Sequence, residues 1–152
     1  MEAAEIRQKL ESTGLRFTPQ RYTVMQFLLA HHNHPTAAEI FAAVNHADPR
    51  LSRATTYNNL RDLVSAGLVR EVPTEGRAAR YDATGEQHHH FICDRCGKME
   101  DIPWHPVATP AAGALGKRVV RECELIIRGL CTQCAPRRRT SSAKPSQPNR
   151  HN

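Results

Sequence analysis

The sequence predicts an α+β fold, in which an N-terminal winged helix-turn-helix domain is followed by a small α/β domain with four paired cysteines. Two observations lead to this prediction. Apolar residues recur at helical spacing up to residue 65, and short extended runs follow Gly67. Beyond them, two Cys-x2-Cys pairs are separated by 34 residues. The helices and extended runs would also fit a small helical bundle with a β-appendage, and periodicity alone does not separate these folds.

The first two helices are expected over residues 3–13 and from Thr18 to about residue 31. In the first, Ile6 and Leu10 are four residues apart. The second begins with a threonine that can cap it. A proline follows at the first helical position, where no N–H is needed. Three apolar residues at helical spacing follow: Val24, Phe27 and Leu28.

The third and fourth helices carry capping signals. Thr36 and Glu39 form a capping box, in which the hydroxyl accepts from the Glu39 amide and the carboxylate reaches back to the threonine. The apolar stripe of this helix consists of Ile40 and Val44. Ser52 can cap a fourth helix over residues 53–65. Its expected inward side chains are Tyr57, Leu60 and Val64.

After Gly67 the pattern changes from helical to extended. Residues 68–72 and 78–82 are joined by Pro-Thr-Glu-Gly, which predicts a hairpin. Proline and glycine interrupt residues 103–116, so any helix there is short or broken. Four further strands are expected: Phe91–Cys93, Met99–Ile102, Val119–Val120 and Leu125–Ile127.

These changes divide the chain into domains over residues 1–82 and 83–135 and a basic tail over residues 136–152. The formal net charge is +6. The first domain holds ten Lys/Arg and nine Asp/Glu, the second six of each, and the tail five basic residues and no acidic one. The tail has too few apolar side chains to fold and is expected to be disordered. Net charge therefore says little about polyanion binding by the folded part.

No run of the sequence approaches the roughly 18 apolar residues of a membrane span. The first ten residues, MEAAEIRQKL, lack the basic start and apolar stretch of a secretory signal. We expect a cytoplasmic protein without a membrane partner.

The paired cysteines predict a structural zinc site. A two-residue gap lets both sulfurs of a pair face one point, and two pairs complete a tetrahedron of thiolates, which suits Zn²⁺ and leaves no position open. The four residues are Cys93, Cys96, Cys131 and Cys134. Two redox CxxC motifs or an iron–sulfur cluster are the alternatives. Cys123 remains outside the pairs, and we interpret it as a small buried or interfacial side chain, with a reactive thiol as the alternative.

A second candidate metal site surrounds three consecutive histidines. In a strand, His88 and His90 point to one face and His89 to the other. Carboxylates flank them at Asp82 and Asp101. A further candidate ligand, in the loop before the third helix, is His34. Imidazoles with carboxylates suit Fe²⁺, Mn²⁺ or Zn²⁺. Alternatively, the triple histidine is a polar surface run.

Six segments together resemble the ferric uptake regulator (Fur) family of bacterial metal-responsive transcription factors. They are GLRFTPQR (14–21), HPTAAEIF (34–41), LSRATTYNNLRDLVSAGLV (51–69), ARYD (79–82), HHHFICDRCGKMED (88–101) and GLCTQC (129–134). The resemblance covers about residues 5–135. It implies an N-terminal winged-helix DNA-binding domain, a C-terminal α/β dimerisation domain and a homodimer.

The resemblance also implies two metals per subunit. The four paired cysteines match the family's structural zinc ligands. The family's regulatory site, for one Fe²⁺ or Mn²⁺, is matched by His34, Asp82, His88, His90 and Asp101. His89 matches a ligand of a further site in some members. Since Gln87 and Ala108 stand where that site usually has histidine and glutamate, we expect it to be absent.

Aspartate at both 82 and 101 resembles the peroxide-sensing branch of the family (PerR). The branch implies that Fe²⁺-catalysed oxidation of His34 or His88 releases metal and DNA, whereas Mn²⁺ lacks this chemistry. This is self-oxidation without turnover, so the protein is not expected to be an enzyme. The alternative within the family is an iron- or zinc-responsive uptake regulator. From another class, a small metalloenzyme activating water through His88 and His90, or a metal store, would leave the LSRATTYNNL segment unexplained.

On the DNA side, the resemblance places the fourth helix in the major groove of an A/T-rich palindromic operator. A dimer reads two half-sites about 34 Å apart. The first turns of the helix, a minor-groove arginine and two phosphate-contacting arginines supply the expected contacts: Arg16, Arg53, Thr55, Thr56, Tyr57, Asn58, Asn59 and Arg61.

Overall fold

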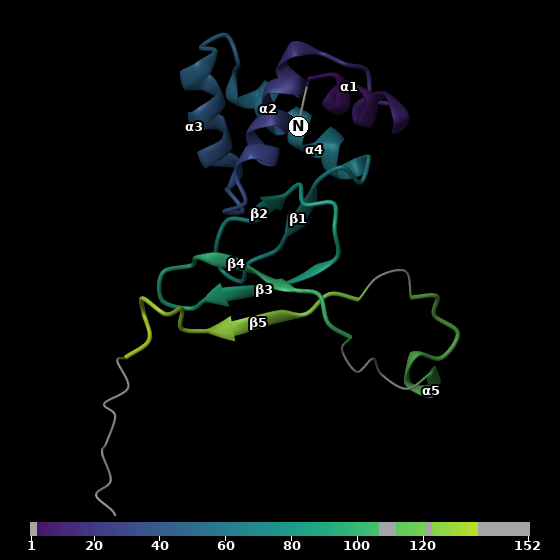
Figure 1. Cartoon of the computed structure of the whole chain (residues 1–152), viewed down its shortest axis with the longest axis vertical. Helices are drawn as coiled ribbons and strands as arrows, with labels where there is room; N and C mark the ends of the chain where they lie inside the picture. Colours follow the sequence, from purple (N-terminus) through teal and green to yellow (C-terminus); the bar gives the residue numbers. More distant parts are fainter. Residues whose placement is uncertain (1–2, 107–111, 121–122, 137–152) are drawn as a thin grey trace, which may run out of the picture.

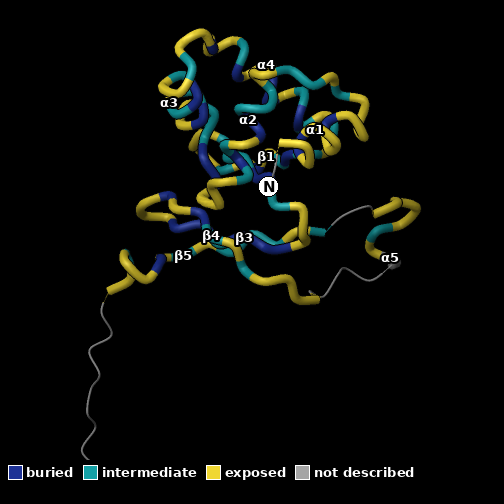
Figure 2. The backbone as a smooth tube through the Cα atoms, turned by 45° about the horizontal axis from the view of Figure 1, so that its top comes forward, coloured by how far each residue is buried: buried dark blue, intermediate teal, exposed yellow. Residues whose placement is uncertain are grey.

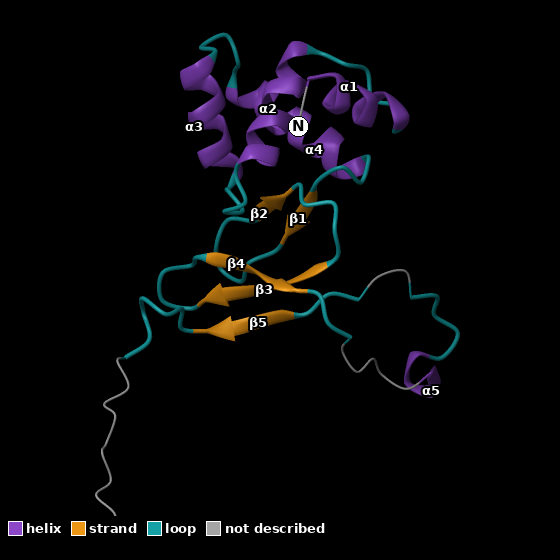
Figure 3. Ribbon diagram, in the orientation of Figure 1, coloured by secondary structure: helices purple, strands orange, loops and turns teal. Residues whose placement is uncertain are grey.

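The computed structural model of the chain describes residues 3–106, 112–120 and 123–136. It contains helices and strands in two sheets (Figure 3), which confirms the α+β prediction. The helices are α1 (Ala3–Ser12), α2 (Pro19–Ala30), α3 (Ala37–Ala47), α4 (Arg53–Ser65) and α5 (Ala112–Leu115). The strands are β1 (Arg70–Val72), β2 (Arg80–Asp82), β3 (His88–Cys93), β4 (Met99–Pro103) and β5 (Ile126–Gly129). Almost all of the expected basic tail, residues 137–152, lies outside the described residues.

Helices α1–α4 gather at one end of the molecule, and the three-stranded sheet lies at the other, with the β1–β2 hairpin between them (Figure 1). The hairpin strands pair antiparallel, as expected. In the larger sheet the strand order is β4-β3-β5, with β3 antiparallel to β4 and parallel to β5. The parallel pair requires a long crossover, because β3 ends 33 residues before β5 begins.

The predicted caps are present at three helix starts. The Thr18 hydroxyl accepts from the amide of Arg21 at the start of α2. At α3, Thr36 and Glu39 form the complete capping box. The Ser52 hydroxyl accepts from the amide of Thr55 at the start of α4. Side chains thus satisfy backbone donors that the first helical turn leaves free.

The principal hydrophobic cluster lies among the four helices. Its fully buried members include Ile6 and Leu10 of α1 and Leu60 and Leu63 of α4. A buried aliphatic side chain of this kind stabilises the fold by about 1.5–3 kcal/mol. A second, smaller cluster beneath the sheet consists of Val72, Ile92 and Met99, with Ile126 against it. The helical end therefore has much the larger apolar core.

The expected inward face of α4 is displaced by one residue. Tyr57 is 41% exposed, while Thr56 and Asn59 are buried, so the prediction for Tyr57 is wrong. The polar groups are accommodated because Thr56 Oγ1 donates to the Ser52 carbonyl and Asn59 Nδ2 to the Thr55 carbonyl. Leu60 faces inward as expected, and Val64 is half-buried.

The expected strand at Val119–Val120 is not formed. Val119 is 86% exposed and follows the short helix α5, which stands away from the larger sheet (Figure 2). No strand in the described part of the chain pairs with it, so its backbone joins no ladder there. The last strand begins at Ile126, one residue later than expected. Of residues 103–116, the structure describes one four-residue helix, α5, in agreement with a short or broken helix.

A partly buried ion pair joins α2 to α4. Arg21 Nη2 lies 2.7 Å from Asp62 Oδ2, and the arginine side chain is 12% exposed. The same guanidinium donates to the Arg16 carbonyl through Nη1. Among the described residues, no helix is long and apolar enough to span a membrane.

Replacing Leu63 by alanine tests the helical core. We expect the free energy of unfolding to fall by about 2–5 kcal/mol, because the substitution leaves a cavity where the side chain is fully buried. Urea unfolding followed by circular dichroism measures the change. Val119→Ala, at an exposed position, is the control. Equal stability of the two variants would contradict the assigned core.

Candidate metal centre

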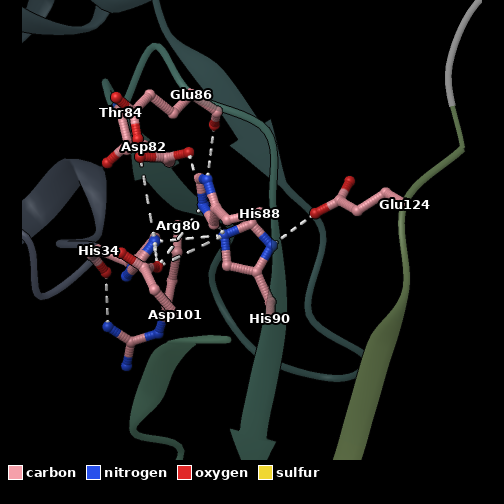
Figure 4. A network of polar contacts seen from close by, with 9 residues as sticks. All are labelled: His34, Arg80, Asp82, Thr84, Glu86, His88, His90, Asp101 and Glu124. Carbon is pink, nitrogen blue, oxygen red and sulfur yellow. Dashed lines mark hydrogen bonds and ion pairs between the residues drawn. The ribbon is translucent and has the colours of Figure 1, made fainter. Parts of the chain in front are cut away.

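Four ligand-type side chains from separate parts of the chain converge at one point (Figure 4). One atom from each of His34, Asp82, His88 and His90 lies within 4.8 Å of the corresponding atoms of the others. His34 comes from the loop between α2 and α3, Asp82 ends β2, and the two other histidines share one face of β3. The site therefore lies between the helices and the larger sheet.

The ring nitrogens approach one another closely. His88 Nε2 lies 3.0 Å from His90 Nε2, which lies 3.2 Å from His34 Nε2. Asp82 Oδ2 lies 3.2 Å from His88 Nε2. All four side chains are buried, and Asp82 Oδ2 accepts no hydrogen bond. Nitrogen and oxygen donors thus face a common centre.

Asp101 on β4 borders the same cluster. Its Oδ1 lies 2.9 Å from His34 Nε2, 3.5 Å from His88 Nε2 and 4.0 Å from His90 Nε2. The side chain is 35% exposed, more than those of the other four residues. All five residues expected to form the regulatory site are therefore brought together.

The hydrogen bonds made by Nδ1 of His88 and His90 indicate which ring nitrogen carries the proton. His88 Nδ1 donates to the Glu86 carbonyl at 2.8 Å, and His90 Nδ1 donates to Glu124 Oε1 at 2.5 Å. With these protons on Nδ1, the Nε2 lone pairs of both rings face each other. Burial lowers the pKa of the His34 imidazole. The neighbouring Asp101 and Asp82 carboxylates raise it, but by less than burial lowers it. Imidazole nitrogens that converge with carboxylate oxygens fit a bound cation, and this donor set suits Fe²⁺, Mn²⁺ or Zn²⁺.

The loop carrying His34 is held against β2. His34 has φ of 49°, a left-handed conformation that is uncommon for residues other than glycine. Arg80 Nη1 donates to the His34 carbonyl at 2.8 Å, and the Tyr81 amide donates to the Pro35 carbonyl at 3.0 Å. Thr36 also forms a β-bridge with Arg80. These contacts aim an imidazole from the helical end toward the sheet.

A second cluster contains the four paired cysteines, Cys93, Cys96, Cys131 and Cys134. Each contributes a sulfur within 4.8 Å of the others. Their geometry matches the prediction of a four-thiolate site.

The parallel pairing of β3 and β5 creates this cluster. Cys93 lies opposite Gly129, two residues before Cys131. Backbone amides, first that of Cys131 and then that of Cys96, lower the pKa of the Cys93 thiol to about 6. Hydrogen bonding to Cys131 raises the pKa of Cys134 to about 12. A Zn²⁺ ion at this point would stabilise all four sulfurs as thiolates.

The turn of the β1–β2 hairpin contacts the first cysteine pair. Arg77 Nη2 donates to the Asp94 carbonyl at 3.0 Å. Gly97 has φ of 72°, and a Cβ at this position would collide with the Arg77 guanidinium. A glycine therefore permits the close approach of the hairpin to the cysteine turn.

His89 points away from the metal centre. It is fully buried, and its Nε2 donates to the His105 carbonyl at 2.9 Å. Its ring packs on Trp104, with the ring centres 4.7 Å apart. Ala108, the other position considered for a further site, lies outside the described residues. The expected absence of that site stays a prediction.

Cys123 is half-buried and outside the cysteine cluster.

The residues expected to contact DNA divide by exposure. Exposed members are Arg16, Arg53, Tyr57, Asn58 and Arg61, and Thr55 is half-buried. The Arg53 guanidinium of α4 lies over the Phe41 ring of α3, 5.3 Å from its centre. Thr56 and Asn59 face the core and bond to backbone carbonyls, so we remove both from the expected contact set.

Sequence reasoning missed Glu124, whose carboxylate reaches the outer nitrogen of His90. The two residues are 34 positions apart. No motif or spacing in the sequence links them, because the contact depends on the parallel pairing of β3 with β5.

Comparison with known proteins identifies the family. The family model described as "Ferric uptake regulator family" matches residues 12–126. The chain belongs to the ferric uptake regulator family. The match covers α2–α4, the hairpin and the metal centre, and it ends before the second cysteine pair.

Curated relatives cover most of the chain. The "Peroxide-responsive repressor PerR" of Staphylococcus saprophyticus is 39% identical over 129 residues, or 82% of this chain and 86% of the relative. The "Peroxide operon regulator" of Bacillus subtilis is 37% identical over 141 residues, or 89% and 97%. The solved structure of the Campylobacter jejuni peroxide stress regulator is 26% identical with a TM-score of 0.62, covering 88% of this chain and all of that one. Sequence and fold thus agree on the Fur family.

Replacing Cys131 by serine tests the cysteine cluster. We expect loss of bound zinc, because one of the four converging sulfurs is removed. Metal analysis of the purified protein measures the change. The control, Cys123→Ser, lies outside the cluster and should retain the zinc. Equal zinc contents in the two variants would contradict the assignment.

Proposed function

We propose that this Fur-family protein is a homodimeric, metal-dependent transcriptional repressor that senses peroxide. One observation carries the proposal: the buried ligand cluster draws His34 from the helical end and His88 and His90 from the sheet, with aspartate at 82 and 101. The names of its relatives support the peroxide response. A metalloenzyme or a metal store would not need the exposed polar face of α4.

The position of the ligands couples metal binding to the arrangement of the molecule. His34 precedes α3, while His88, His90 and Asp101 belong to the larger sheet. A cation held by residues from both ends restricts the angle between helices and sheet. In a dimer, this restriction sets the separation of the two α4 helices. Coupling of this kind is typically about 1–3 kcal/mol, or roughly 5–150-fold in DNA affinity.

The exposed side chains of α4 supply the DNA-reading surface. Arg53, Tyr57 and Asn58 lie on its first turns, and the opposite face packs in the core. We assign base or phosphate contacts to these residues and to Thr55, and phosphate contact to Arg61. Arg16 would enter the narrow minor groove of an A/T-rich operator. In a homodimer, two such surfaces would read palindromic half-sites about 34 Å apart.

The regulatory site would hold one Fe²⁺ or Mn²⁺ per subunit, and the cysteine cluster one structural Zn²⁺. An Fe²⁺ ion held there would supply the redox chemistry that breaks the O–O bond of peroxide, so that one oxygen atom adds to a neighbouring imidazole and the other leaves as water, whereas Mn²⁺ would supply geometry alone. The candidates for oxidation are His34 and His88, whose Nε2 atoms face the centre. An oxidised His34 would no longer tie the helical end to the sheet, and DNA would be released.

We assign DNA binding to residues 1–82 and metal binding with dimerisation to residues 83–135. The boundary follows Asp82, the last residue of β2. Ala83 still packs against the helical cluster, so the connection between the two parts is short. A short connection transmits a change at the metal centre to the helices.

Mn²⁺ should increase affinity for an A/T-rich palindromic duplex by roughly 5–150-fold. His34→Ala should remove this response, because it deletes the ligand from the helical end. Fluorescence anisotropy with and without Mn²⁺ measures both effects. His46→Ala, at an exposed position of α3, is the control and should respond as the wild type does. If wild-type affinity is independent of Mn²⁺, the switch does not exist.

Low peroxide should add one oxygen atom to His34 or His88 of the Fe²⁺-loaded protein and abolish its DNA binding. The Mn²⁺-loaded protein should stay unmodified and bound, because Mn²⁺ does not reduce peroxide under these conditions. Intact mass, peptide mapping and anisotropy on both samples measure the outcome. An iron-loaded protein that stays unmodified and bound to DNA would rule out peroxide sensing and favour an iron- or zinc-uptake regulator.

A further inference from the structure

We propose that Glu124 is a positioning residue of the metal centre, which holds the His90 imidazole through its outer nitrogen and directs the Nε2 lone pair at the bound ion. The inference rests on the proposed metal-dependent function. His90 Nδ1 lies 2.5 Å from Glu124 Oε1 (Figure 4). The imidazole is fully buried, and the glutamate side chain is 29% exposed.

The two nitrogens of His90 face opposite partners. Nε2 lies 3.0 Å from His88 Nε2 and 3.2 Å from His34 Nε2, inside the ligand cluster. An ionised carboxylate only accepts hydrogen bonds, so the proton of the neutral ring must sit on Nδ1. Glu124 thereby selects the tautomer that leaves Nε2 free to coordinate. A carboxylate behind a ligating imidazole also raises its basicity as a ligand.

The three histidines of the ligand cluster differ in the hydrogen-bond partner of Nδ1. The Nδ1 of His88 donates to a backbone carbonyl, that of Glu86. The Nδ1 of His34 is buried and has no hydrogen-bond partner among the described residues. His90 alone of the three has a charged partner at this position, and a charge-assisted hydrogen bond is roughly twice as strong as a neutral one. His90 is therefore the ligand whose orientation is held most firmly.

The backbone beside Glu124 supports the same contact. The His90 amide donates to the Leu125 carbonyl at 3.0 Å, directly before β5. At its other end β5 leads into Cys131 of the cysteine cluster. The carboxylate is thus presented by a segment that is paired with β3 and anchored near the zinc site. A partner held by paired backbone can keep a ligand within the tolerance that metal geometry requires.

Glu124→Ala and Glu124→Gln test the proposal on the full chain with its zinc retained. Co²⁺ serves as the probe, titrated into the regulatory site and followed by its visible absorption bands. Two-bond ¹H–¹⁵N correlation spectra of the metal-free protein report the His90 tautomer independently of any metal. The matched control is Glu75→Ala, which removes a carboxylate that is 90% exposed and lies 4.0 Å from Arg128 of β5.

Glu124→Ala should weaken Co²⁺ binding by about 10–100-fold, the usual effect of losing a partner of this type. Its His90 should lose the preference for a proton on Nδ1. Glu124→Gln should show a smaller loss, because the amide oxygen still accepts the proton but carries no charge. Glu75→Ala should match the wild type in both measurements.

The proposal is overturned if Glu124→Ala binds Co²⁺ within a factor of two of Glu75→Ala, or if its His90 tautomer equals that of the wild type. Should Glu124→Ala lose zinc or unfold, Glu124→Gln decides, and wild-type affinity in that variant overturns the proposal. A wild-type protein that binds no Co²⁺ beyond the cysteine site would overturn the proposed function as well. A wild-type response with an unaffected Glu124→Ala overturns this inference alone.

Discussion

The approach of His34 to the histidines of β3 is the contact on which the proposed activity of this protein depends. His34 Nε2 lies 3.2 Å from His90 Nε2 and 2.9 Å from Asp101 Oδ1, although the residues belong to opposite ends of the molecule. The nitrogens and the carboxylate oxygen are all atoms that can coordinate a cation. A bound cation would therefore stabilise the contact between the two ends of the molecule. In the proposed mechanism, metal binding is therefore coupled to the equilibrium between arrangements of the helices and the sheet.

Two features of the backbone make this contact possible. The Arg80 guanidinium donates to the His34 carbonyl and so holds the left-handed conformation of this residue. The parallel pairing of β3 with β5 places the cysteine pairs together at one end and Glu124 behind His90 at the other. One strand pairing thus serves both metal sites. A substitution that disrupts β5 should therefore affect both metal sites, because both depend on the β3–β5 hydrogen-bonded ladder.

The α4 helix shows how polar residues can be divided between core and surface. Thr56 and Asn59 are buried because nearby backbone carbonyls accept their hydrogen bonds. Their inward position leaves Tyr57 and Asn58 on the outer face. A period of 3.6 residues cannot choose between these registers when most candidates are polar. Packing against α2 and α3 made the choice, and it also determined which side chains are available to DNA.

The sequence by itself determined what depends on near neighbours: the helix caps at Thr18, Thr36 and Ser52, the hairpin, the pairing of cysteines two residues apart, and the shared face of His88 and His90. It also contains the family motifs from which all five ligands of the regulatory site were predicted. Only the tertiary structure decided the partners of Glu124 and Arg21, the outward turn of Tyr57 and the exposure of Val119. Backbone geometry constrains residues a few positions apart directly. Contacts across 34 or 41 positions form only when the whole chain packs, because no local preference compensates the entropy of closing such loops.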